Sequence, residues 1–485
     1  MHIESLLDKK EVIQVEIIRF LLFQTKKTTK QTLAKKVKLT QNALKEYLVD
    51  IVTTCQSLGE TFNISIEEKE LAITFSSDIN FDKIILAYVN QSLAYQILRY
   101  VLEHKKVSIF QLSQEFSSSE ATIFRKLRDL NQLLKPFHIK IKNGQLVGDE
   151  LQIRYFYYSL LTIIDTEFSS DDLAVTYLIE KIQPEFRHTF SKGALKRLSC
   201  WLFVTRHRLS VANHENSHFF DIQDKFISDP LYQKMGEVIQ RYFQDMVSYV
   251  GKYEGAMFYC FFVSFDILGA DNFSSYDLTR RKKISTAMLD TYSREIILSY
   301  YGYQRLSISD EKGLAYKLSQ IHTRVFCFQG EMTLYDPKRI HDYFQQYITP
   351  DMTDLIIRLI QTAQERLGLT ETIKPFLWTN YANILVSINL SLYQNLTVGI
   401  DLDNLFSFGE SLYHFLLSEL SGIPQVRFEK FHEYEYYDLI LTTREKPIAE
   451  TPHYYYLSEF ISPYDIEKIK LIINKIKHQK NNYQK

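Results

Sequence analysis

Two segments near the start of the chain align without a gap at an offset of 79 residues. They are 33–51 (LAKKVKLTQNALKEYLVDI) and 112–130 (LSQEFSSSEATIFRKLRDL). Apolar residues coincide at Leu33/Leu112, Val37/Phe116, Leu44/Ile123, Leu48/Leu127 and Ile51/Leu130. In each copy this spacing predicts a short amphipathic helix, a brief break and a longer amphipathic helix. The repeat therefore predicts two helix-turn-helix units.

Residues that cap helices stand where each of these helices should begin. Thr29 and Thr40 precede the two helices of the first copy, and Ser108 and Ser119 precede those of the second. Their side-chain oxygens can accept hydrogen bonds from the backbone N–H groups that a helix leaves free at its N-terminus. Gln111 follows Ser108 by three residues, which predicts a capping box.

A further helix precedes each copy, and an alternating segment follows it. The second alternating segment contains Asn143-Gly144, a pair that favours a tight β-hairpin turn. A helix, a helix-turn-helix and a hairpin together make a winged helix, so the pattern predicts this domain twice. The expected segments are helices at 11–23 and 82–103, hairpins at 64–73 and 139–147, and winged helix-turn-helix domains at 1–77 and 78–160.

A winged helix places the second helix of its motif in the DNA major groove and its wing against the neighbouring backbone. Between 24 and 45 the chain has seven lysines and no acidic residue, which favours contacts with phosphates. Gln and Asn suit adenine, whereas Arg and Lys suit guanine or phosphate. The expected base readers are Thr40, Gln41, Asn42, Lys45, Ser119, Thr122, Arg125 and Lys126, and the expected phosphate contacts are Lys26, Lys27, Lys30, Lys35, Lys36 and Lys38. Winged helices that serve only protein contacts remain an alternative, above all for the second copy, which bears Glu115 and Glu120.

The rest of the chain predicts a mainly α, multidomain protein. Gly and Pro number only 15 and 10 among 485 residues, which favours long helices over a turn-rich β architecture. Short strands alternate with helices near the end, as in a small α/β domain with a mostly parallel sheet. The expected domains are two all-helical bundles at 165–278 and 279–393 and an α/β domain at 394–485. The expected helices are 171–182, 193–209, 231–250, 254–268, 280–300, 311–325, 353–367, 375–393, 409–420 and 465–477, and the expected strands are 396–400, 425–428, 438–442 and 454–457.

Enzyme chemistry finds little support in the sequence. The four cysteines form no CxxC pair, and there is no P-loop, GxGxxG or GxSxG motif. His214 to His218 spell H-E-x-x-H, with Glu237 as a candidate third zinc ligand, but polar residues around them indicate a loop, where the match is chance. We therefore expect no enzyme activity, no cofactor and no metal. Without a signal peptide or a membrane-spanning stretch, we also expect a cytoplasmic protein that stays off the membrane.

This order of domains resembles the Mga-like transcriptional regulators of Gram-positive bacteria. The resemblance is carried by LAKKVKLTQNALKEYL, LSQEFSSSEATIFRKLRDLN and IKIKNGQLVGDELQIRYFYYSLL. It implies an activator of virulence or colonisation genes, in which two phosphotransferase-system regulation domains (PRDs) follow the DNA-binding domains. It also implies that histidine phosphorylation tunes the PRDs and that a C-terminal domain shaped like a sugar-transporter IIB component helps to form a homodimer.

Several positions depart from that family pattern. Phe261 and Asn389 stand where PRDs often carry histidine, and no cysteine follows Cys327 to serve as the phosphorylated residue of a IIB domain. His322 is then the better candidate for a phosphoryl acceptor, and His207 is the weaker one. The C-terminal domain is expected to be an interaction surface.

Two functions of different classes follow from the sequence. The first is a transcription regulator that binds double-stranded DNA as a homodimer or larger assembly. Such a regulator can recognise DNA curvature more than sequence. The second is a phospho-acceptor relay coupled to phosphocarrier proteins of the phosphotransferase system. An RNA-binding antiterminator also carries paired PRDs, but its RNA module does not resemble two winged helices. A zinc metalloprotease is the remote alternative.

Overall fold

The computed structural model describes most of the chain, and every structural statement below refers to that part. It covers residues 1–23, 28–57, 81–164, 189–209, 226–243, 252–278, 284–302, 306–345, 347–392, 396–402, 408–423, 426–433, 435–444, 453–458 and 461–483, with 176, 179–180, 183–184 and 280. The fold is mainly helical, as predicted. The chain divides into two compact units, 1–382 and 383–485.

The first helix-turn-helix unit has the predicted order of helices. A short 3-10 helix, η1 (Ile3–Leu6), leads into α1 (Lys9–Phe23), which is followed by α2 (Lys30–Lys36) and α3 (Gln41–Ser57). Thr29 caps α2 by accepting a hydrogen bond from the Thr32 amide at 3.3 Å, as predicted. The hairpin predicted at 64–73 lies outside the described residues.

The second unit is a complete winged helix. It consists of α4 (Phe81–Gln91), α5 (Leu93–Glu103), α6 (Ile109–Glu115), α7 (Glu120–Leu134), η2 (Lys135–Phe137), β1 (Lys140–Lys142) and β2 (Gln145–Val147), and α8 (Glu150–Ile164) follows. The predicted hairpin is an antiparallel pair in which Ile141 faces Leu146. The predicted capping box of Ser108 and Gln111 is present.

The single helix predicted at 82–103 is wrong, because two helices occupy this stretch. Ser92 has an extended backbone, and its hydroxyl accepts a hydrogen bond from the Tyr95 amide at 3.3 Å. It therefore begins a new helix, α5. Apolar periodicity continues across the junction because both helices bury one face, so the pattern alone gave no sign of the break.

The helical body of the first unit follows α8. It contains α10 (Lys192–Leu209), α12 (Pro230–Phe243), α13 (Lys252–Ser264), α14 (Ala270–Asp277), α15 (Ser285–Tyr301), α16 (Ile308–Cys327), α17 (Pro337–Gln345), α18 (Pro350–Leu367), η3 (Glu371–Ile373) and α19 (Lys374–Leu392), whose last residues belong to the second unit. The sequence did not predict α14 and α17. The helix expected at 280–300 begins only at Ser285. The boundary between two bundles at 278 stays a prediction.

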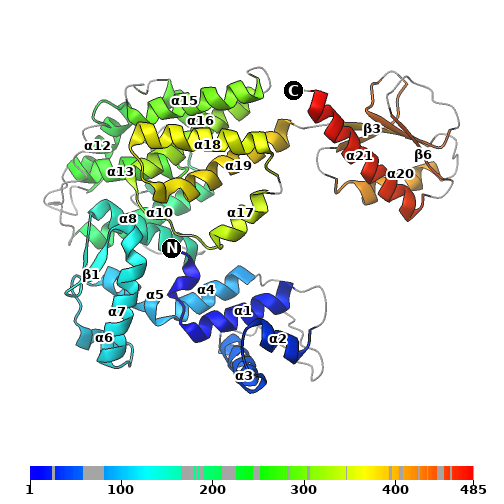
Figure 1. Ribbon diagram of the computed structural model, residues 1–485. Coiled ribbons are helices and arrows are strands. Elements are labelled where there is room, and N and C mark those ends of the chain that lie inside the picture. The colour runs from blue at the N-terminus through cyan, green and yellow to red at the C-terminus, as the bar shows by residue number, and fades with distance from the viewer. Residues whose placement is uncertain are drawn as a thin grey trace. The chain divides into compact units, whose positions relative to one another are not determined.

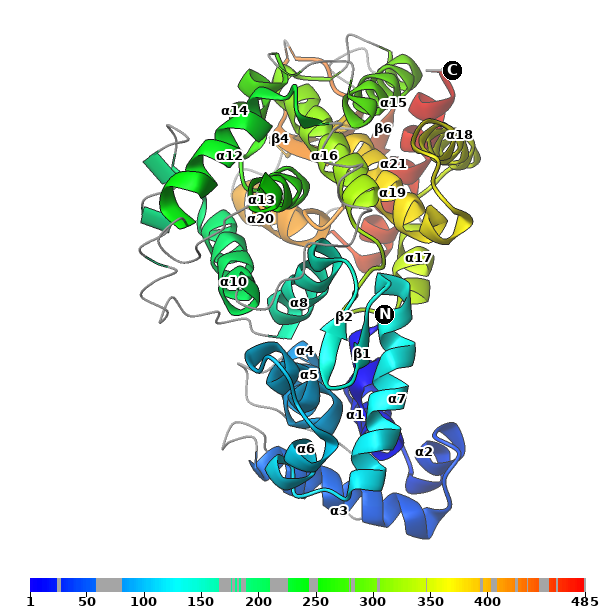
Figure 2. The ribbon, with the colours of Figure 1, turned by 90° about the vertical axis from the view of Figure 1, so that its left-hand side faces the viewer.

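The winged helices lie at one end of the first unit. Both views place α2, α3 and α6 away from α15 and α16 (Figure 1, Figure 2). One hydrophobic core nevertheless runs from η1 through both helix-turn-helix units into the body, and α8 is buried almost throughout its length within it. Aromatic residues fill this core: Phe261, for example, stacks on Trp201 with ring centroids 4.5 Å apart.

The second unit contains a small parallel sheet, as predicted. Its elements are β3 (Leu396–Asp401), α20 (Gly409–Leu420), β4 (Val426–Lys430), β5 (Leu439–Thr442), β6 (Tyr454–Tyr456) and α21 (Pro463–Tyr483). The strands are all parallel in the order β4-β3-β5-β6, with Val398 opposite Leu439. Leu416 of α20 and Ile469 of α21 pack with the central strands in one apolar core. Within the described residues, no helix is both long and apolar enough to span a bilayer.

Candidate nucleic-acid interface

The turn between the two helices of the motif has the same conformation in both copies. Lys38 and Ser117 stand at equivalent positions and both have a left-handed backbone, with φ of 56° and 46°. The amide of the next residue bonds to a carbonyl five positions earlier, which closes a Schellman motif. These bonds run from Leu39 to Ala34 (2.9 Å) and from Ser118 to Ser113 (3.0 Å). The helix-turn-helix repeat found in the sequence is therefore also a repeat in the structure.

Thr40 and Ser119 position the candidate recognition helices. Thr40 Oγ1 accepts from the Ala43 amide at 3.2 Å, and Ser119 Oγ accepts from the Thr122 amide at 3.2 Å. The hydroxyls of Ser119 and Thr122 also bond to each other at 2.9 Å. The geometry thus gives Thr40, Ser119 and Thr122 local roles in fixing the starts of α3 and α7. Their contacts with bases stay predictions.

The exposed face of α7 presents two arginines. Arg125 and Arg128 are both exposed, and Arg125 makes no ion pair with any described residue. Arg128 Nε lies 3.6 Å from Asp129 Oδ1, in a pair open to water. Lys126 differs from both, because its ammonium pairs with Asp8 just before α1 and only 15% of its side chain is exposed. In this conformation Lys126 connects the two helix-turn-helix units and does not point to a free surface.

The wing adds two cations that the sequence reasoning did not single out. Lys140 and Lys142 are exposed on β1, on either side of the buried Ile141. Asn131 of α7 holds that strand: its amide nitrogen donates to the Ile141 carbonyl at 3.0 Å, and its oxygen accepts from the Ile141 amide at 2.6 Å. The alternation K-I-K was the signal that could have found these lysines, since alternate residues of a strand share one face.

The wing turn is docked against the start of α6. Asn143 and Gly144 have φ of 53° and 74°, as a type I′ hairpin turn requires. The Val107 amide donates to the Gly144 carbonyl at 3.0 Å. A Cβ at Gly144 would lie 1.6 Å from the Val107 carbonyl oxygen, so only glycine fits. Lys140 and Lys142 are therefore held in a fixed place beside α7.

The first copy presents a denser set of free cations. Lys35, Lys36, Lys38 and Lys45 are exposed and Lys30 is half-buried, and none of them forms an ion pair with a described residue. Gln41 and Asn42 are exposed in the first turn of α3. The structure thus places most of the predicted residues on α2, α3 and their turn. Lys26 and Lys27 lie outside the described residues.

Aromatic side chains are exposed on the second winged helix. Phe110 of α6 and Phe124 of α7 expose 60% and 63% of their surface. A groove of about 610 Å³ runs between α6, α7 and the wing, and Phe124 and Arg128 are among the residues that line it. Phe can contact a thymine methyl group or stack on an unpaired base, so this composition suits nucleic acid.

Together with a match to a known domain family, these features indicate a DNA-binding transcriptional regulator. Both copies of the motif have capped helices, a matching turn and exposed cations, and the second has a complete wing. Residues 77–161 match the Mga helix-turn-helix domain family, which supports the resemblance to Mga-like regulators. The match covers α4 to α8 and does not reach the first copy or the helical body. A search of curated proteins found no match to the chain.

His322, the first candidate for a phosphoryl acceptor, is fully buried. Its Nδ1 lies 2.6 Å from Asp290 Oδ1, and its Nε2 lies 2.8 Å from the Tyr381 hydroxyl. Both ring nitrogens are therefore engaged, and neither is open to a phosphate donor in this conformation. Arg280 also binds Asp290 at 2.6 Å, so His322 belongs to a buried polar network between α15, α16 and α19.

His207, the second candidate, is more open. It is half-buried near the end of α10, and its Nδ1 lies 3.0 Å from the Phe203 carbonyl. Its Nε2 makes no hydrogen bond with a described residue. The geometry thus reverses the order of the two candidates, and phosphorylation of either stays a prediction.

No group of histidine, cysteine, aspartate or glutamate side chains within the described residues could hold a metal ion. The H-E-x-x-H segment, residues 214–218, lies outside them.

Proposed function

We propose that the protein regulates transcription by binding double-stranded DNA through both winged helices. The observation that supports this most directly is the duplicated motif, in which matching turns position α3 and α7, each with an exposed cation in its second turn. Lys45, Arg125 and Arg128 would contact bases or phosphates from the recognition helices. Lys35 and the wing lysines Lys140 and Lys142 would contact the backbone.

The resemblance to Mga-like regulators supports the finer part of the proposal. The protein would be an activator of virulence, colonisation or carbohydrate-linked genes, with a PRD-like helical body. The second unit, with its parallel sheet, would help to form a homodimer. Sedimentation of the full chain tests the dimer, because a monomer at micromolar concentration would contradict it.

The experiment that tests DNA binding is the salt dependence of affinity for a mixed pool of genomic fragments. The matched set comprises wild type, Lys35→Glu/Lys45→Glu, Arg125→Glu/Arg128→Glu, and the control Lys317→Glu/Lys338→Glu on exposed positions of α16 and α17. Each lost phosphate contact should reduce the slope of log K against log salt by about 0.9. Both test variants should therefore lose up to about 2 in slope.

Three outcomes separate the roles of the two copies. If only the first double variant loses affinity, the second winged helix serves protein contacts. If only the second loses it, the first copy serves another partner. If the control falls as far as the test variants, net charge explains the effect and the proposed interface is wrong.

Phosphotransfer regulation is the second candidate, and the observation that favours it is that His207 Nε2 has no hydrogen-bond partner among the described residues. General phosphotransfer proteins should then leave acid-labile phosphate on the full chain, and His207→Ala should remove it. Equal labelling of wild type and His207→Ala would exclude this residue as the acceptor.

A further inference from the structure

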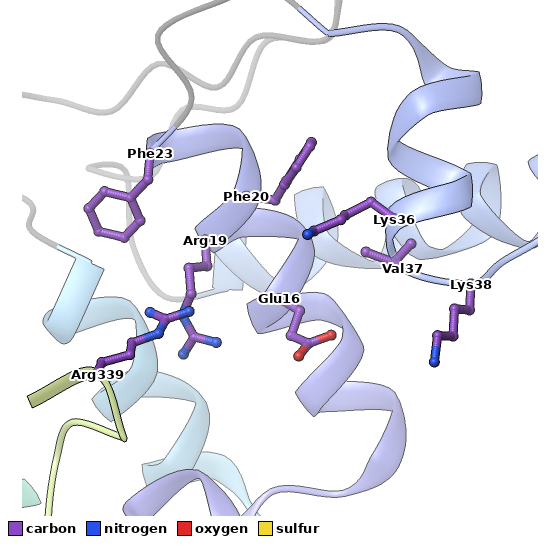
Figure 3. A pocket seen from close by; sticks show the side chains of 8 residues that line it. All are labelled: Glu16, Arg19, Phe20, Phe23, Lys36, Val37, Lys38 and Arg339. Carbon is purple, nitrogen blue, oxygen red and sulfur yellow. The ribbon is translucent and has the colours of Figure 1, made fainter. Parts of the chain in front are cut away.

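A cavity of about 680 Å³ lies between α1, the end of α2 with its turn, and α17. Its size is within the range of small-molecule sites. Figure 3 shows its lining side chains, which come from segments about 300 positions apart in the sequence. They are Glu16, Arg19, Phe20, Phe23, Lys36, Val37, Lys38 and Arg339.

The charge of this lining favours an anion. Among the described residues that line the cavity, four side chains are cationic and Glu16 is acidic, and Arg19 is paired with Glu4 just outside the lining. Lys36, Lys38 and Arg339 form no ion pair with any described residue. These three cations have no carboxylate partner in the described part of the chain and repel one another, and an anion placed among them converts this repulsion into attraction.

Arg19 is fixed in place within the cavity wall. Its guanidinium binds Glu4 and lies over the Phe81 ring, 5.0 Å from the ring centroid. Its Nε is buried and has no hydrogen-bond partner among the described residues. In Figure 3 the guanidinium groups of Arg19 and Arg339 are directed toward one another. Two facing guanidiniums can each donate a pair of hydrogen bonds to phosphate oxygens.

The apolar part of the lining suits a flat ring. Phe20 and Phe23 come from the last turns of α1, and Phe23 exposes 68% of its surface although its ring contacts Phe81 edge-on. A ring bound beside Phe23 would bury this surface and would have the rigid shape that aromatic walls recognise. The lining therefore combines a cationic end with an aromatic wall.

An adjoining hollow of about 450 Å³ shares Glu16, Arg19, Phe23 and Arg339 with this cavity. It is also lined by Glu4, Asp82 and Asp336, so its charge disfavours an anion. Glu4 is bound to Arg19, Asp82 accepts from the Tyr335 hydroxyl at 2.8 Å, and Asp336 accepts from the Lys338 amide at 2.9 Å. The difference confines the anion site to the first cavity.

We propose that this cavity binds a small aromatic phosphate monoester, with its phosphoryl group between Arg19, Arg339 and Lys36 and its ring against Phe23. Such a ligand bridges the first helix-turn-helix unit to α17 of the helical body. A phosphate of the DNA backbone carries the same phosphoryl chemistry and is the other source that could occupy the cationic end. Binding measured without DNA separates the two sources.

The test uses the full chain without DNA and phenyl phosphate as the probe, with binding measured by calorimetry. Arg339→Ala should weaken binding about tenfold or more, because it removes charge-assisted hydrogen bonds. Lys338→Ala is the matched control, since Lys338 is an exposed cation on the same helix outside the lining. Phenol, which lacks the charge, should not bind, and inorganic phosphate, which lacks the ring, should bind more weakly than phenyl phosphate.

Glu16→Gln is a second variant, chosen because a loss of phenyl phosphate binding in Arg339→Ala could come from misfolding alone. It removes the carboxylate from the lining, so binding of phenyl phosphate should tighten, which an unfolded variant cannot mimic. The proposal is overturned if wild type does not bind phenyl phosphate at millimolar concentration, or if Arg339→Ala and Lys338→Ala behave alike. It is also overturned if Arg339→Ala weakens DNA binding while phenyl phosphate binds neither protein, because DNA then occupies the cationic end.

Discussion

Replacing Gly144 in the wing turn should release the wing from the second winged helix. The residue has φ of +74°, a conformation that costs a residue with a side chain about 1–2 kcal/mol. The new Cβ would lie 1.6 Å from the Val107 carbonyl oxygen, so the two backbones must separate. The Val107 amide then loses its bond to Gly144, and an unpaired buried amide costs about 1–3 kcal/mol. Together these terms make Gly144→Ala cost the wing about 2–5 kcal/mol.

Gly368→Ala is the matched control for this substitution. Gly368, just after α18, also has a left-handed backbone, with φ of +64° and ψ of 37°, but a Cβ there would meet no atom within 4 Å. It should therefore cost its own surroundings only the backbone strain, about 1–2 kcal/mol. The difference between the two variants isolates the contact between the wing and Val107.

Hydrogen exchange followed by mass spectrometry measures the local stability of the wing directly. Peptides that cover 104–110 and 138–148 should exchange faster in Gly144→Ala, by about tenfold for every 1.4 kcal/mol lost. The same peptides should keep their wild-type rates in Gly368→Ala, while the far-ultraviolet circular dichroism of both variants stays that of a helical protein. Wild-type exchange across the wing of Gly144→Ala would refute the reasoning, since the turn would then not be held by Val107.

Three further predictions concern a turn, a buried ion pair and the second unit. Ser117→Gly should stabilise the second winged helix by up to about 1 kcal/mol, because it removes the strain of a left-handed residue, and slower exchange of peptides from α6 and α7 would show it. Glu254→Gln should cost about 3–5 kcal/mol, because Glu254 binds the buried guanidinium of Arg154 through both oxygens at 2.6 and 2.8 Å. Glu103→Gln, which breaks an exposed pair with Arg99, should cost less than about 0.5 kcal/mol, and equal effects on exchange in α8 would contradict the role of burial. Burial disfavours the charged form of Asp465, but hydrogen bonds from Ser458, Ser462 and Tyr455 outweigh it and lower its pKa to about 2. A depressed carboxyl pKa stabilises the fold above the unfolded value near 4 and ceases to do so as pH falls toward 2, so the second unit should lose about 2 kcal/mol over that range. In Asp465→Asn this acid-dependent loss should be absent from exchange in β6 and α21, and an unchanged pH profile would exclude Asp465 as its source.

The sequence was most informative where a local pattern determines a local structure. Ser108 and Ser119 cap the helices that they were predicted to cap, and Asn143-Gly144 forms the predicted turn, because capping and tight turns depend on a few adjacent residues. The left-handed turn at Ser117 was missed, since glycine usually marks such positions. Helix α14 was also missed: its sequence is mostly polar, and it is held by the packing of Phe273 on Tyr316.

The residues of the candidate sites could likewise be predicted where they lie in one stretch of sequence, and not where tertiary packing brings them together. Lys35 and Lys45 could be predicted, because a run of lysines beside a capped helix is visible in one stretch of sequence. The cavity could not be predicted, because Arg339 reaches Arg19 only through tertiary packing. His322 became the weaker phosphoryl-acceptor candidate because it is buried. A single histidine in an amphipathic helix gives no sign of whether residues such as Asp290 and Tyr381 will enclose it.

Under the proposed function, helix α8 is the element through which a signal in the helical body would reach the second winged helix. It begins directly after the wing, and Glu150 in its first turn binds Arg154 and also Arg208 of α10 at 2.7 Å. Arg154 in turn binds Glu254 of α13, and all four side chains are buried. Sliding α8 against α10 or α13 would strand charges in the core, which costs several kcal/mol for each. We therefore expect the three helices to move together, so that a change in the body would reorient the second winged helix as a whole and leave its wing docked on Val107.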